Sequence, residues 1–227
     1  MARLWDNRKS KHFCGGSVLN NWWVVTAAHC ITKQGVDAST LFIRLGDYDD
    51  VELENEEILH EVDEIIVHPD YRGSTFDSDI ALIRLANKVT FTDHILPVCL
   101  PPREVAMSML KKGTMGRVLG WGSIREGGTY PRYLKEVELP VRRIGECRKS
   151  TRFSVTTNMF CAGYKLEMRG DSCKGDSGGP MVQRSTENKW QLVGIVSWGE
   201  GCAERDKFGF YTKVYKFNQW IQGTIRE

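Results

Sequence analysis

Apolar residues along this chain gather in short runs that are separated by glycine, proline and polar turn residues. The clearest runs, rich in β-branched, aromatic and leucine side chains, are residues 22–25, 41–45, 80–85 and 192–196. Short strand-like runs between turn signals are typical of antiparallel sandwiches and barrels. The pattern therefore predicts an all-β fold over most of the 227 residues.

The end of the chain follows a different period. Apolar residues recur there at helical spacing, at Val214, Phe217, Trp220 or Ile221, and Ile225. This spacing puts one apolar face on a helix. We predict an amphipathic helix over residues 213–226, with its aromatic side chains in the core.

The stretch 97–113 carries prolines and charges and lacks the strand pattern, so it predicts a connector between two halves. The first half covers about residues 1–98 and the second about residues 114–212. The length suits a single protein domain of the larger all-β kind.

Charge and hydropathy exclude several function classes. The formal net charge is +2, which gives no reason to expect nucleic acid or a membrane surface as the main partner. No apolar run approaches the roughly 20 residues that a membrane-spanning helix needs, and no signal peptide opens the chain. Export must therefore be inferred from cysteine.

The chain contains seven cysteines, at positions 14, 30, 99, 147, 161, 173 and 202. They do not form the paired C-x-x-C knuckles of zinc sites. An odd number in a secreted chain predicts an intermolecular partner or a free thiol.

Three separated segments carry the chemistry. Residues 175–180 place Ser177 among glycines, residues 26–30 contain His29, and residues 77–83 contain Asp79. A base, a carboxylate and a nucleophile in this chain order match the order of chymotrypsin. The chain thus resembles the chymotrypsin-like, trypsin-type serine proteases, and the resemblance covers nearly all of it.

The resemblance implies the role of each residue. Ser177 would attack a peptide carbonyl, His29 would take its proton, and Asp79 would orient His29. The backbone N–H groups of Gly175 and Ser177 would form the oxyanion hole. No cofactor is needed for this reaction. Taken singly, each side chain has a plain structural alternative as a turn or core residue.

The family fold has two six-stranded β-barrels with the active site in the cleft between them. His29 and Asp79 would then lie on the first half and Ser177 on the second. The resemblance also implies disulfides that join Cys14 to Cys30, Cys147 to Cys161, and Cys173 to Cys202. Such bridges require an oxidising compartment, so we expect a secreted, extracellular protein.

Cys99 is left over, and in relatives with this motif it tethers a separate propeptide or light chain. The alternative is a buried unpaired thiol.

Asp171 corresponds to the base of the family's primary specificity pocket. A buried carboxylate there favours a guanidinium or ammonium, so the resemblance implies cleavage after Arg or Lys. An exposed loop aspartate is the alternative. Further substrate contacts are implied at Ser172, Ser197, Trp198, Gly199 and Gly209, with Ser197 also supporting Asp79.

The acidic segment, residues 47–57, occupies the family's calcium-loop position, and Ca²⁺ prefers oxygen ligands from one flexible loop. The implied ligands are side-chain oxygens of Asp47, Glu54 and Glu57 and backbone oxygens of Asp49 and Glu52. The alternative is a solvated charged face. In addition, an aromatic residue at position 208 accompanies a sodium site in the vitamin K-dependent coagulation proteases, although Phe208 equally suits the core.

Relatives begin their active form with Ile-Val-Gly-Gly, whose freed α-amino group pairs with the aspartate before the nucleophile, here Asp176. Cys14 lies too near Met1 for that segment to fit between them. We therefore expect the given chain to lack the activation segment, which leaves Asp176 a buried acid without its partner.

The sequence favours a zymogen-derived, trypsin-like endopeptidase of a regulated cascade, with protein substrates and protein protease inhibitors as partners. A protease homologue that binds without cleaving is one alternative, and the presence of His29, Asp79 and Ser177 argues against it. A digestive trypsin is the other, disfavoured by Cys99 and the acidic segment.

Overall fold

The computed structural model describes residues 1–52, 56–123, 127–165, 173–202 and 204–226. Its first half is a closed antiparallel barrel in the order β1-β2-β3-β6-β5-β4. The strands are β1 (Ala2–Asp6), β2 (Lys11–Val18), β3 (Trp23–Thr26), β4 (Leu41–Leu45), β5 (Ile58–Val67) and β6 (Ala81–Leu85). The runs at 22–25, 41–45 and 80–85 thus correspond to β3, β4 and β6.

Strand β4 shows why these residues close a barrel. Leu41, Ile43 and Leu45 are fully buried, whereas Phe42 and Arg44 between them are partly exposed. Alternate side chains of a strand point to opposite faces, so every second position fills the barrel interior.

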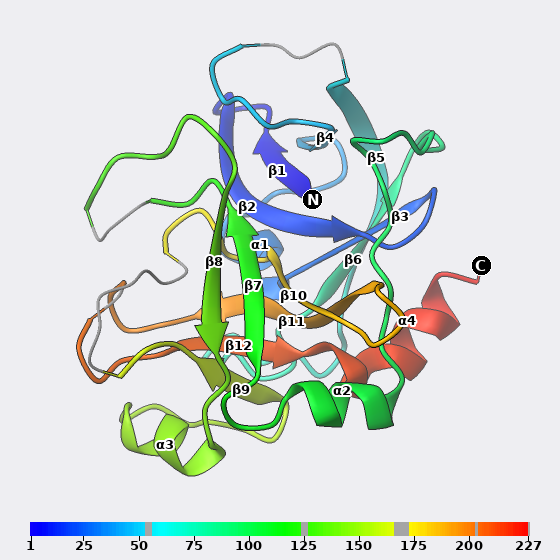
Figure 1. Ribbon diagram of the computed structural model, residues 1–227. Helices are drawn as coiled ribbons and strands as arrows, with labels where there is room; N and C mark the ends of the chain where they lie inside the picture. Colours follow the sequence, from blue (N-terminus) through cyan, green and yellow to red (C-terminus); the bar gives the residue numbers. More distant parts are fainter. Residues whose placement is uncertain (53–55, 124–126, 166–172, 203, 227) are drawn as a thin grey trace.

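The second half is a six-stranded sheet in the order β8-β7-β10-β11-β12-β9. Its strands are β7 (Met115–Gly120), β8 (Lys135–Pro140), β9 (Met159–Ala162), β10 (Pro180–Arg184), β11 (Trp190–Trp198) and β12 (Gly209–Lys213). A bridge between Val141 and Ala162 brings the two edge strands together, which gives the sheet its barrel-like form. The expected architecture of two six-stranded β units is therefore confirmed, and Figure 1 shows them one above the other.

The helices are short: α1 (Ala28–Thr32), α2 (Arg103–Met109), α3 (Ile144–Lys149), the 3-10 turn η1 (Val214–Phe217) and α4 (Asn218–Thr224). The predicted terminal helix is present but shorter than expected and begins as a 3-10 turn. Val214, Phe217 and Ile221 are buried, as the spacing predicted. None of the helices in the described part of the chain has the length and apolar character that crossing a membrane requires.

Helix α2 lies inside the stretch that the sequence indicated as a plain connector. It buries Ala106 and Met109. Two apolar contacts in seven residues are too weak a periodic signal to predict a helix from the sequence.

Hydrogen bonds between the halves fix the cleft where they meet. Gly15 of β2 donates its N–H to the carbonyl of Ser177 at 2.7 Å. The Thr212 hydroxyl of β12 donates to the carbonyl of Asp79 at 2.8 Å. The segments that carry the candidate site are therefore held directly against one another.

Candidate active site

His29 and Asp79 meet because β3 pairs with β6. Thr26 lies opposite Ala81, so the segments just beyond these two strand ends are neighbours. His29 Nδ1 lies 2.7 Å from Asp79 Oδ2, and the His29 backbone N–H donates to Oδ1 at 2.8 Å. Ser197 Oγ donates to Oδ2 at 2.5 Å. The carboxylate, which has no exposed surface, thus receives hydrogen bonds from both halves of the molecule.

The contact with Asp79 favours the tautomer of His29 that carries a proton on Nδ1. An imidazole whose Nδ1–H is donated to a carboxylate keeps a free lone pair on Nε2, as a general base requires. The ring also packs edge-on against Phe76, with centroids 5.5 Å apart. Phe76 has φ of 57°, an uncommon conformation for a bulky residue, and no pattern in the sequence pointed to it.

Ser177 lies in a tight turn that only glycine permits at two positions. Gly175 has φ of +101° and Gly178 has φ of +77°. A Cβ on Gly178 would lie 2.2 Å from Thr26 Oγ1 and 2.5 Å from the Gly15 carbonyl oxygen. The turn can therefore approach the first barrel only without side chains there.

Two backbone N–H groups of this turn have no acceptor among the described residues. The N–H groups of Asp176, Gly178 and Gly179 donate to carbonyl oxygens at 2.8–3.0 Å. Within the described part of the chain, those of Gly175 and Ser177 have no acceptor. Two unpaired N–H groups beside a serine hydroxyl are what an oxyanion hole requires.

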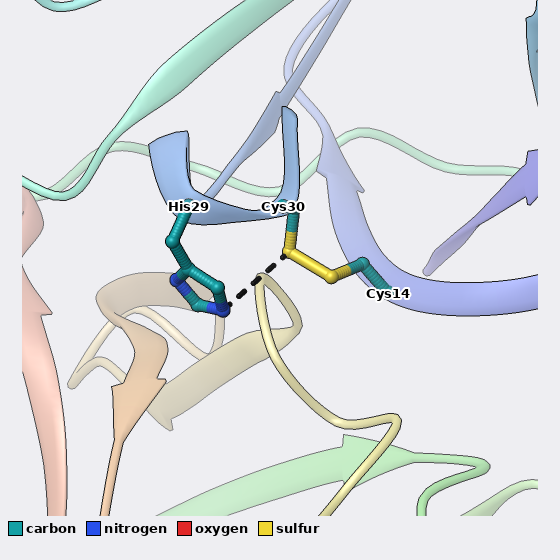
Figure 2. Close-up of side chains that lie close together, drawn as sticks. All are labelled: Cys14, His29 and Cys30. Carbon is teal, nitrogen blue, oxygen red and sulfur yellow. Dashed lines mark hydrogen bonds between the residues drawn. A yellow bond between two sulfur atoms is a disulfide. The ribbon is translucent and has the colours of Figure 1, made fainter. Parts of the chain in front are cut away.

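Ser177, Gly175 and His29 line one open cleft of about 610 Å³ together with the Cys14–Cys30 disulfide. Among the described contacts, no hydrogen bond joins Ser177 Oγ to His29 Nε2. Figure 2 shows Nε2 directed towards Cys30, with Sγ 3.9 Å away. Catalytic hydrogen bonds are often long without substrate, so this geometry is compatible with proton transfer.

The same three side chains also bring their ligand atoms within 4.8 Å of one another. The two sulfurs are joined in a disulfide and carry no thiolate charge, so the group does not form a metal site.

Residues 1–221 match the family model described as Trypsin. The chain belongs to the trypsin family. It is a serine endopeptidase, a hydrolase of peptide bonds, and its two barrel-like halves have the family's architecture.

Asp176, which precedes the nucleophile of this protease, is buried. Its carboxylate accepts hydrogen bonds from the N–H groups of Gly122 and Cys173, each at 2.8 Å. Burial raises its pKa to about 6, although these two hydrogen bonds oppose the rise. A Cβ on Gly122 would lie 2.3 Å from the carboxyl carbon, so only glycine allows this close approach.

The walls of the proposed specificity pocket are described only in part. Trp198 at the end of β11 stacks on Phe210 with centroids 3.9 Å apart. A Cβ on Gly199 would meet nothing closer than 3.7 Å, and Gly209, the first residue of β12, lies opposite Ala162. Asp171 and Ser172 lie outside the described residues.

All three expected disulfides are formed: Cys14–Cys30, Cys147–Cys161 and Cys173–Cys202. Cys99 is a free thiol and is exposed, so the alternative of a buried thiol is wrong. The tether through Cys99 stays a prediction.

The acidic segment is held by arginines. Arg3 Nη1 donates to Asp47 Oδ2 at 2.6 Å, and both side chains are almost fully buried. Arg44 pairs with Glu57 at 2.8 Å and lies 3.8 Å from Asp47.

Two further acids of the segment, Asp49 and Glu52, share a third arginine. Arg132 donates Nε and Nη2 to the two oxygens of Asp49, at 2.8 and 2.7 Å, and Nη2 also donates to Glu52 at 2.7 Å. The Arg132 guanidinium lowers the pKa of Asp49 to about 2. Glu54 lies outside the described residues.

Calcium binding stays a prediction. Ca²⁺ takes six to eight oxygen ligands. No three carboxylates of the described residues converge on one point, and the implied ligand Glu54 lies outside those residues. Asp47 Oδ1 is buried without a hydrogen-bond partner, which supplies a single candidate ligand oxygen. Guanidinium groups occupy the positions beside the other acids.

Phe208, the residue that suggested sodium, is a core side chain. It is buried, and the Arg142 guanidinium carbon lies 5.3 Å from its ring centroid. Sodium binding stays an untested prediction.

Proposed function

We propose that this protease is a secreted enzyme of a regulated proteolytic cascade that cleaves protein substrates after Arg or Lys. The observation that carries the proposal is the hydrogen-bonded unit of His29, Asp79 and Ser197 beside the Ser177 turn. A buried, fully hydrogen-bonded carboxylate behind an imidazole, with a serine in the same cleft, is the arrangement that acyl transfer needs.

In the proposed mechanism, Ser177 Oγ attacks the carbonyl carbon of the scissile bond while His29 Nε2 takes the hydroxyl proton. Asp79 stabilises the resulting imidazolium without taking its proton. The N–H groups of Gly175 and Ser177 hold the negative oxygen of the tetrahedral intermediate. His29 then protonates the departing amine, which leaves an acyl-enzyme on Ser177. Water, activated by His29, releases the acid and restores the serine.

The preference for Arg or Lys rests on the resemblance at Asp171 and is supported by the open surroundings of Gly199. The test compares hydrolysis of Arg, Lys and Phe p-nitroanilides by the wild type and by Asp171→Ser. Loss of the counter-charge should lower kcat/KM for Arg and Lys by at least about 100-fold. The control is Asp93→Ser, which removes an exposed aspartate in a loop. Retention of Arg cleavage within a few-fold by Asp171→Ser would refute the pocket assignment.

Secretion and covalent tethering are supported by the cysteines. Three disulfides are stable in an oxidising compartment, and the exposed Cys99 is accessible to a thiol of a propeptide or light chain. A tethered chain favours a zymogen-derived cascade protease over a digestive trypsin. Protein protease inhibitors that present Arg or Lys to the cleft are further proposed partners.

A further inference from the structure

Four lysines surround the cleft that holds His29 and Ser177. Lys9 lies in the turn between β1 and β2, and Lys11 is the first residue of β2. Lys33 follows α1, and Lys174 precedes the Ser177 turn. All four are exposed. We name the space that they line with His29 and Ser177 the lysine cleft.

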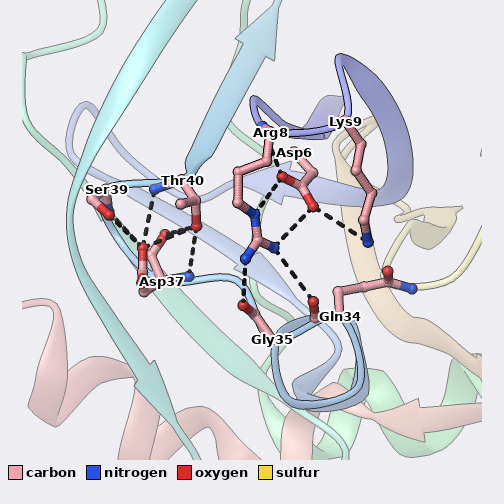
Figure 3. Close-up of polar contacts among 8 residues, drawn as sticks. All are labelled: Asp6, Arg8, Lys9, Gln34, Gly35, Asp37, Ser39 and Thr40. Carbon is pink, nitrogen blue, oxygen red and sulfur yellow. Dashed lines mark hydrogen bonds and ion pairs between the residues drawn. The ribbon is translucent and has the colours of Figure 1, made fainter.

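The acid that lines the lysine cleft is already neutralised. Asp6 is buried, accepts hydrogen bonds from the Arg8 guanidinium at 3.0 Å, and lies 3.6 Å from Lys9 Nζ. Figure 3 shows Arg8 and Lys9 converging on this carboxylate. The cleft therefore keeps an excess of positive charge.

The other three lysines have no counter-ion in the described part of the chain. No carboxylate there lies within ion-pair distance of Lys11, Lys33 or Lys174. Lys33 Nζ instead lies 3.9 Å from the centre of the Phe76 ring. An aromatic ring attracts a cation but leaves its charge uncompensated, so Lys33 can still attract an anion.

The chemistry indicates which part of a substrate enters the lysine cleft. His29 gives its proton to the departing amine, so the peptide after the scissile bond leaves on the side of His29. The Cys14–Cys30 disulfide and the four lysines line that side. The proposed specificity wall at Trp198 and Gly199 does not line this cleft.

We propose that the lysine cleft selects substrates with Asp or Glu among the first few residues after the scissile bond. The inference rests on the proposed function, because it requires the substrate direction that the catalytic roles of His29 and Ser177 fix. The same charges disfavour Lys or Arg there, since like charges would approach one another.

The expected preference is moderate and sensitive to salt. Exposed ion pairs are each worth about 0.2–1 kcal/mol, or up to about fivefold. Two or three engaged lysines then give a preference of about tenfold. The Debye length falls from about 30 Å at 0.01 M salt to about 3 Å at 1 M, so high salt should remove most of the preference.

The experiment uses two internally quenched peptides that are identical up to the cleaved Arg. One continues with Ser-Glu-Asp and the other with the neutral, nearly isosteric Ser-Gln-Asn. We expect kcat/KM of the active wild-type protein to be about tenfold higher for the acidic peptide at low salt. The ratio should approach one as sodium chloride is raised towards about 1 M.

The variant Lys11→Gln/Lys33→Gln should lower the acidic-to-neutral ratio to about two or three. The control Lys88→Gln should leave it unchanged, because Lys88 is exposed beyond the end of β6 where Arg84 pairs with Trp23, away from His29. An Arg p-nitroanilide, which has no residues after the scissile bond, is the reference substrate, and the kcat/KM of each peptide is divided by that of the anilide for the same protein.

A wild-type ratio below about twofold at low salt, with the Arg anilide still hydrolysed, would overturn the acidic preference and leave the proposed function standing. A ratio that is high but unchanged in Lys11→Gln/Lys33→Gln would likewise overturn the role of the lysine cleft alone. Failure of the wild type to hydrolyse any Arg anilide, even when the chain begins with a free Ile-Val-Gly-Gly, would overturn the proposed function and this inference together.

Discussion

Replacing Asp176 by Asn tests the electrostatic state of the turn that carries Ser177. The carboxylate is buried and held by two backbone N–H groups, and no cation of the described residues pairs with it. An ionised group in such a position destabilises the folded protein. The amide of Asn cannot ionise, so the variant removes this pH-dependent contribution.

The size of the effect follows from the two pKa values. Burial raises the folded-state pKa of Asp176 from 3.8 to about 6. The folded state thus binds the proton of Asp176 more tightly than the unfolded state does. The resulting contribution to the unfolding free energy is fully present below about pH 4 and is lost as pH rises through about 6. A separation of about two pKa units corresponds to about 3 kcal/mol of unfolding free energy.

The wild type alone would not reveal this slope. Desolvation of the His12 ring, and to a smaller extent the charge of Arg3, lowers the pKa of His12 to about 3. A histidine that resists protonation in the folded state makes stability rise with pH. Both proteins contain His12, so its contribution cancels when the unfolding free energy of Asp176→Asn is subtracted from that of the wild type. The remaining pH dependence is that of Asp176. Asn loses one hydrogen bond, which shifts that difference by a constant.

The assay is equilibrium unfolding in denaturant, followed by tryptophan fluorescence at several pH values with the disulfides intact. The unfolding free energy of the wild type minus that of Asp176→Asn should fall by about 3 kcal/mol between about pH 4 and pH 7. Asp93→Asn, an exposed replacement, should show no such trend. A difference that stays flat within about 0.5 kcal/mol would refute the raised pKa of Asp176.

The same unfolding measurement can be made on a chain that is extended so that it begins with a free Ile-Val-Gly-Gly. The family's α-ammonium group would pair with Asp176, lower its pKa and remove the slope. The extended chain should also hydrolyse a small Arg amide orders of magnitude faster, because Asp176 adjoins the oxyanion donors. Equal turnover, normalised by active-site titration, would contradict this account of activation.

Two further predictions concern the catalytic unit and the acidic segment. Ser177→Ala and His29→Ala should each abolish hydrolysis of Arg amides without unfolding the protein, and the double variant should be hardly slower, because the residues act together; multiplicative losses in kcat would contradict the triad. Millimolar calcium that binds the acidic segment should raise the Tm relative to EDTA, with a gain in unfolding free energy of RT ln(1 + [L]/Kd), and the unpaired Asp47 Oδ1 offers one ligand oxygen. An unchanged Tm would leave the segment a solvated charged face.

Much of the fold was predictable because its signals are local. Strand β4 alternates buried and exposed residues, and the terminal helix repeats its apolar residues at helical spacing. Helix α2 was not predicted, since it buries little and its stability depends on contacts with the rest of the chain.

The chemistry of the site was also predictable in part. The motifs around His29, Asp79 and Ser177 identified the family, and the hydrogen bond from Ser197 to Asp79 was expected from it. Phe76 was missed, because its ring meets His29 only through a backbone conformation that is rare for its residue type.

The acidic segment shows why the remainder required the tertiary structure. Its charge density is visible in the sequence, but Arg3 lies 44 residues from Asp47 and Arg132 lies 83 residues from Asp49. The sequence thus shows the acids but not the guanidinium groups that the fold places beside them. Which charges become neighbours depends on strand pairing and loop closure, which no local pattern records.

The sequence by itself determined the catalytic residue types, the disulfide framework and the β-rich architecture. Only the tertiary structure decided the surroundings of these residues: the burial that raises the pKa of Asp176, the arginines on the acidic segment, and the lysines that gather beside His29. The physical reason is the range over which each kind of interaction acts. Backbone propensity and side-chain chemistry act within a few residues of the chain, whereas burial and charge interactions depend on distance in space.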